Sequence, residues 1–134
     1  MTLALQVATV AELQTLMLPA ATPGEILADA FNNYGLWIGP KVEGIFEKKL
    51  DKLHVKITSG DTVLMDEDRT HPSTDPFTAY AWFVNFLRGR GDTLKKGHIV
   101  TTGSYAGVVD APIGKPVRVE LEGIGAVEIE LRIG

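Results

Sequence analysis

The chain has 134 residues, the usual length of a single domain, and its 45% hydrophobic and 22% charged residues are typical of a soluble globular protein. Its net charge of −4 gives no electrostatic reason to expect a nucleic-acid partner. The absence of cysteine excludes a disulfide framework, a thiol nucleophile and a thiolate zinc site. We see neither a signal-peptide pattern nor a stretch of membrane-spanning length, so we expect a cytoplasmic protein with no membrane partner.

Short elements are predicted for the first third of the chain. Residues 1–18 are mostly apolar, and their periodicity fits a strand pair or a helix equally well. Thr22 and Glu25 have the spacing of a capping box, which predicts a short helix that ends at residues 29–30. Residues 36–38 then read as a short strand that a Gly-Pro pair stops.

Two hairpins are predicted from alternating apolar and polar residues. Residues 53–57 alternate strictly, a Ser-Gly-Asp turn follows, and residues 62–65 return. Residues 117–122 and 126–133 alternate on either side of a Gly-Ile-Gly turn and form the clearest hairpin. With one main helix between the hairpins, the pattern predicts a single α+β domain, residues 1–134, of mostly antiparallel strands.

A polar loop is predicted over residues 66–74. It leads into a helix, a strand and a loop around which the rest of the chain is organised. Asp75 is a good N-cap, Pro76 suits the first helical position, and apolar residues recur at helical spacing until the glycines around residue 90. Residues 98–102 predict a strand, and 103–107 a small-residue loop that lets a ligand approach the backbone. A helix on a sheet followed by an ordinary glycine turn would explain the same pattern.

Three motifs in the second half of the chain occur in the order and spacing of one enzyme family. They are Pro-x-x-Ala-x-x-Trp in the helix, Leu-x-x-Gly-x-Ile-Val-x-Thr-Gly-Ser around the strand, and Gly-x-Gly-x-Val near the end. The matching residues are Pro76, Ala79, Trp82, Leu94, Gly97, Ile99, Val100, Thr102, Gly103, Ser104, Gly123, Gly125 and Val127. From Glu25 onward the chain therefore resembles the C-terminal part of the fumarylacetoacetate hydrolase superfamily, in particular its 2-keto-4-pentenoate hydratase and 4-oxalocrotonate decarboxylase branch.

The resemblance implies a shortened mixed β-roll that lacks the family's N-terminal portion. It also implies one Mg²⁺ or Mn²⁺ ion, held by three carboxylates, which chelates a 2-oxo or 2-hydroxy acid and stabilises an enolate. Two of those ligands belong to a Glu-x-Glu motif that does not occur here before Asp29, and Glu12 alone is placed like the third. Residues 120–122 and 128–130 have the Glu-x-Glu spacing, but in the terminal hairpin they fit a solvated strand face better.

Two loops are candidates for contact with such an acid. Hydroxyl groups and exposed N–H groups beside a glycine can hold a carboxylate or enolate oxygen, and the resemblance places both loops at the substrate pocket. A strand-end turn and an Asn-Asn turn would explain the same residues without a ligand. The candidate substrate-binding residues are Thr102, Gly103 and Ser104 on one side and Asn32, Asn33 and Tyr34 on the other.

Each of the three histidines has a different expected role. His71 lies in the loop before the helix, near the family's pocket lid, and is the candidate catalytic general base, although lone loop histidines are usually just loop residues. His54 lies on an alternating strand beside Lys56 and is expected on the surface. His98 is expected to be structural.

These observations leave three functions open. The first is a lyase, a hydratase or decarboxylase that acts on small 2-hydroxy-2,4-dienoates or 2-oxo acids of aromatic catabolism. The second is a non-catalytic or repurposed domain that binds such an acid, which the absent Glu-x-Glu motif favours. The third is a subunit of a homo-oligomer or of a complex with a longer relative, because a half-roll would leave open sheet edges.

Overall fold

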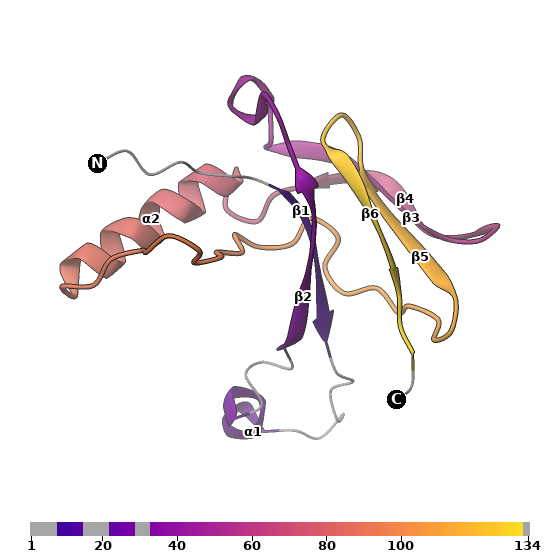
Figure 1. Ribbon diagram of the computed structural model, residues 1–134, viewed down its shortest axis with the longest axis horizontal. Helices are drawn as coiled ribbons and strands as arrows, with labels where there is room; N and C mark the ends of the chain where they lie inside the picture. Colours follow the sequence, from indigo (N-terminus) through magenta and orange to yellow (C-terminus); the bar gives the residue numbers. More distant parts are fainter. Residues whose placement is uncertain (1–7, 15–21, 29–32, 133–134) are drawn as a thin grey trace.

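The described part of the chain forms a small α+β fold with one main helix, as predicted (Figure 1). The computed structural model describes residues 8–14, 22–28 and 33–132. Neither of the α-helices that it describes is long and apolar enough to cross a membrane. The elements are β1 (Ala8–Gln14), α1 (Pro23–Ala28), β2 (Asn33–Lys41), the 3-10 helix η2 (Ile45–Glu47), β3 (Lys52–Ser59), β4 (Thr62–Thr70), α2 (Pro76–Gly89), β5 (Pro116–Leu121) and β6 (Gly125–Glu130).

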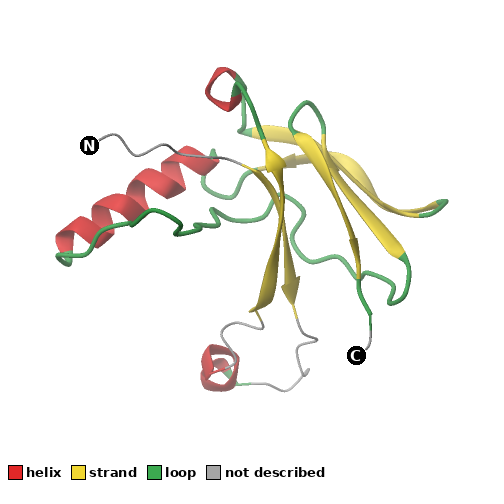
Figure 2. Ribbon diagram, viewed as in Figure 1, coloured by secondary structure: helices red, strands yellow, loops and turns green. Residues whose placement is uncertain are grey.

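A four-stranded antiparallel sheet in the order β4-β3-β5-β6 carries much of the core (Figure 2). Alternation on β3 buries every second side chain, so Val55 and Ile57 pack with Val117 of β5. Both predicted hairpins are confirmed, since β3 pairs with β4 and β5 with β6. A second buried cluster is formed by the connection from β2 to β3 and the start of β3. It consists of Val42, Ile45, Leu50 and Leu53.

The predicted polar loop over residues 66–74 is wrong in its first half. Strand β4 continues through Asp66 and Asp68 to Thr70, because these acidic residues lie opposite cationic residues of β3. Cross-strand pairs of opposite charge stabilise such positions in a sheet.

The undecided N-terminal segment contains a strand. Residues 8–14 form β1, which pairs antiparallel with β2, and the resulting two-stranded hairpin packs against β6. The strand predicted at residues 36–38 is longer and spans Asn33–Lys41. Leu36, Trp37 and Ile38 are all exposed even though consecutive strand residues face opposite sides, so the hairpin is partly bare on both faces.

Both predicted helix starts are confirmed. The Asp75 carboxylate accepts hydrogen bonds from the backbone N–H groups of Phe77 (2.7 Å) and Thr78 (3.0 Å), and Pro76 occupies the first position of α2. The Glu25 carboxylate accepts a hydrogen bond from the Thr22 N–H at 2.8 Å and the Thr22 hydroxyl accepts a longer one from the Glu25 N–H at 3.4 Å, which together form a capping box. The short helix α1 ends at Ala28, slightly earlier than predicted.

The strand predicted at residues 98–102 is not part of a described sheet. The chain runs back along α2 there, and no described strand lies beside it to complete a ladder (Figure 1). A β-branched, alternating sequence favours extended backbone, but a strand also needs a partner for its N–H and C=O groups.

Candidate functional site

A groove lies between α2 and the returning chain, and we call it the α2 groove. Its volume is about 690 Å³, within the range of small-molecule sites. The rings of Trp82 and Phe83 give α2 an apolar wall, but hydroxyl groups occur on both sides of the groove, because α2 also carries a threonine and the returning chain also carries two aliphatic residues. The lining residues are Ser73, Thr78, Ala79, Trp82, Phe83, Ile99, Val100, Thr101 and Thr102.

Residues 99–102 form the side of the groove opposite α2, and they belong to an extended segment of residues 99–103. No backbone hydrogen bond joins this segment to another backbone group in the described ranges. Ile99 and Thr101 are exposed while Val100 and Thr102 are half-buried, which is the alternation of an extended chain. Within the described ranges, its N–H groups therefore have no backbone acceptor and are candidates to donate to a ligand or to another strand.

His71 lies next to Ser73, which lines the groove, and is 4% exposed. It follows β4 directly, and its backbone N–H donates to the Asp51 carbonyl at 2.9 Å. The Ser73 N–H donates to His71 Nδ1 at 3.1 Å, and the ring of Tyr105 meets the imidazole edge-on with a centroid separation of 5.1 Å. These contacts hold the ring between the end of β4 and the loop that follows the 99–103 segment.

The hydrogen bonds assign a tautomer to His71. Burial lowers the pKa of His71 below its ordinary value of 6.5, and the Asp75 carboxylate and the Thr102 backbone only partly oppose this shift. The imidazole is therefore neutral near pH 7, and because Nδ1 accepts from Ser73, the ring proton is on Nε2. Nε2 is buried, and no described atom meets it in good hydrogen-bond geometry, although the Thr102 backbone is near enough to raise the pKa of His71.

Gly103 brings two of the predicted site segments together. A Cβ atom built on Gly103 would lie 3.0 Å from Pro72 Cγ and 3.6 Å from His71 Nε2, so the backbone passes close to the Nε2 side of the imidazole. Its φ of +113° is a conformation that glycine adopts readily and other residues rarely adopt. The resemblance-based candidates at residues 102–104 and the candidate His71 therefore lie side by side.

The other residues of this loop are committed to local contacts. The Ser104 hydroxyl accepts from the Gly107 N–H at 3.0 Å, which closes a turn. The Tyr105 hydroxyl donates to the Leu50 carbonyl, and burial raises the pKa of Tyr105 to about 12. Ser104 and Tyr105 therefore shape the loop, whereas Thr102 lines the groove itself.

The remaining candidates that the structure describes lie on the hairpin of β1 and β2. Asn33 and Tyr34 begin β2, at the end of the hairpin that points away from α2, and Asn32 lies outside the described residues (Figure 1). Glu12 is on β1, where its backbone lies opposite Leu36. The described backbone does not place these positions beside the α2 groove.

The described residues do not fit the metal site that the resemblance implies. Among the residues whose side chains the structure describes, no three His, Asp or Glu residues are grouped so as to hold an ion. In the terminal hairpin, Glu120 pairs with Arg118 at 3.2 Å and Glu130 with Arg132 at 2.8 Å.

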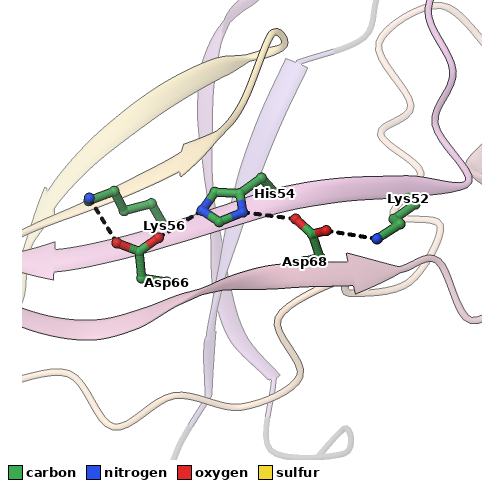
Figure 3. Close-up of polar contacts among 5 residues, drawn as sticks. All are labelled: Lys52, His54, Lys56, Asp66 and Asp68. Carbon is green, nitrogen blue, oxygen red and sulfur yellow. Dashed lines mark hydrogen bonds and ion pairs between the residues drawn. The ribbon is translucent and has the colours of Figure 1, made fainter.

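A five-residue charged row crosses β3 and β4, and sequence reasoning missed it (Figure 3). The two ring nitrogens of His54 lie 2.7 Å from Asp66 and 2.9 Å from Asp68, and these carboxylates also bind Lys56 at 2.8 Å and Lys52 at 2.7 Å. The hydrogen bonds to Asp68 and Asp66 raise the pKa of His54. The sequence did contain a signal for this row, because cationic residues alternate along one strand and acidic residues alternate along the next.

Comparisons with known proteins identify no family for the chain. No family model matches the sequence, and no curated protein and no solved structure matches it significantly. The resemblance stated above thus remains a prediction.

Proposed function

We propose that this chain binds a small 2-oxo or 2-hydroxy-2,4-dienoic acid in the α2 groove. The observation that carries the proposal is the composition of the groove, which combines aromatic rings with hydroxyl groups and with backbone N–H groups that have no backbone partner in the described ranges. A flat unsaturated carbon chain suits the rings of Trp82 and Phe83, and the acid and oxo groups suit the donors of residues 99–103.

Binding suits the described residues better than catalysis. A hydratase or decarboxylase must move a proton, but the His71 lone pair on Nδ1 is used by Ser73 and Nε2 carries the proton. We assign His71 the role of a positioning residue, since it holds Ser73 in the groove wall and supports Gly103. Lyase activity with Mg²⁺ or Mn²⁺ is the alternative, and the family resemblance alone supports it.

Self-association is part of the proposal. The exposed apolar side chains on α2 and on the hairpin of β1 and β2 support either a homo-oligomer or a complex with a longer relative.

A titration followed by two-dimensional NMR tests acid binding. We would add 2-oxopentanoate and 2-hydroxypenta-2,4-dienoate to the labelled protein, with and without Mg²⁺. We expect saturable shifts of the amides of residues 99–103 and of the Trp82 indole. The matched control is Trp37, which is exposed to a similar degree (56% against 65%) but lies on β2. Shifts that are not saturable, or that centre on Trp37, would refute the proposal.

A Mg²⁺-dependent turnover of the dienoate would instead establish the lyase. Loss of that turnover in Glu12→Gln would identify the predicted metal ligand.

A further inference from the structure

Helix α2 and the 99–103 segment form an arm, and few of the other described residues pack against it. None of the fourteen residues of α2 is buried, and Phe77 in its first turn is the described residue through which it packs on a core cluster. Trp82 is 65% exposed and stacks on Phe86 with a centroid separation of 5.3 Å. Ile99, across the groove, is 58% exposed. An apolar helix face without a core to cover it is typical of an interface.

The open backbone of the 99–103 segment is the second feature. Its sequence, Ile-Val-Thr-Thr-Gly, is rich in β-branched residues, and its N–H and C=O groups find no backbone partner in the described ranges. An extended segment of this kind is a template for another strand. Water satisfies its groups in the monomer, whereas a second strand would satisfy them in a ladder.

We propose that two copies of this chain pair through their 99–103 segments, antiparallel about a two-fold axis, with the α2 faces packed around the new strand pair. A strand that pairs antiparallel with its own copy meets the requirement of a two-fold interface, in which the same patch serves on both subunits. This inference does not depend on whether the α2 groove binds an acid.

The arm offers apolar surface for this interface. The proposed arm carries several of the large exposed apolar side chains, among them Trp82, Phe86 and Ile99.

The distribution of charge fits the antiparallel arrangement. At the tip of the arm, beyond the C-terminal end of α2, three exposed cations (Arg90, Lys95 and Lys96) outnumber the one exposed acid, Asp92, and Asp75 caps the opposite end. Antiparallel pairing brings the cationic tip of one copy toward the Asp75 end of the other. A parallel arrangement would instead bring the two cationic tips together, which is unfavourable.

Two matched pairs of variants test the interface by sedimentation. We expect the unmodified protein to sediment at twice its monomer mass of 14.5 kDa. Ile99→Lys should halve that mass, because it places a charge in the new strand pair. Val108→Lys, at an aliphatic residue that is 75% exposed outside the arm, should leave the dimer intact. Trp82→Ser and Trp37→Ser form the second pair, and only the former should dissociate the dimer.

Fluorescence of a single-tryptophan protein gives a second readout that needs no disruptive change. In Trp37→Phe the remaining indole is Trp82, whose emission should shift to the blue as the protein concentration rises through the dimer range. A monomer at millimolar concentration, a dimer that survives Ile99→Lys, or a dimer that only Trp37→Ser dissociates would overturn the proposal. The last outcome would place the interface on the hairpin of β1 and β2.

Discussion

Replacement of Gly103 by alanine tests the contact on which the candidate site depends. The φ of +113° costs an alanine about 1–2 kcal/mol. The added Cβ would also lie 3.0 Å from Pro72 Cγ, so either the rigid proline ring or the loop must shift, at a further cost of about 1–3 kcal/mol. We therefore expect Gly103→Ala to lower the free energy of unfolding by about 2–5 kcal/mol. For a chain of this length that is a fall in Tm of about 8–20 °C.

Gly97→Ala is the matched control. Its φ of +92° imposes a similar conformational cost, but no atom lies within 4 Å of the position that a Cβ would take. Thermal and urea unfolding followed by circular dichroism should show a loss of only about 1–2 kcal/mol for this variant. Equal losses for the two variants would refute the close approach of Gly103 to Pro72 and His71, and with it the arrangement of the site.

Three further results are expected. Tyr105→Phe should cost about 1–3 kcal/mol in urea unfolding, because the buried Leu50 carbonyl loses its donor. His54→Gln should lower Tm most below pH 6.5, and the difference from the unmodified protein should shrink as pH rises through the raised pKa of His54, because the native state binds the His54 proton more tightly there. Calorimetry with 2-oxo acids of increasing chain length should show affinity rising about fourfold per added methylene if the apolar wall of the α2 groove is used, and no dependence on length if it is not.

Local chemistry accounts for the features that the sequence predicted well. The N-cap at Asp75 and the capping pair of Thr22 and Glu25 depend on residues within one helical turn. Alternation within single strands predicted the hairpin of β3 and β4 and that of β5 and β6, because burial of one sheet face determines which residues are apolar.

The features that sequence analysis did not predict depend on contacts between residues that are far apart in the chain. Residues 66–70 read as a polar loop because their charges are compatible with a strand only when Lys52, His54 and Lys56 lie opposite. The prediction of a strand at residues 98–102 was correct about the extended backbone. It was wrong about the strand, because no described strand lies beside these residues to pair with them. No local pattern indicated that His71 is buried, since the covering residues, Gly103 and Tyr105, follow more than thirty positions later.

The α2 groove and the proposed interface share the 99–103 segment, so occupancy and dimerisation should be linked. An acid that binds the dimer more tightly than the monomer must strengthen dimerisation in proportion, since the coupling free energy between two binding events is the same in either order. If the acid uses the N–H groups that pair the strands, it competes with the second copy and weakens the dimer instead. Sedimentation with and without a saturating 2-oxo acid therefore shows which backbone groups the ligand uses. A tightened dimer would place the acid on the α2 side of the segment, and a weakened one would place it on the open strand edge.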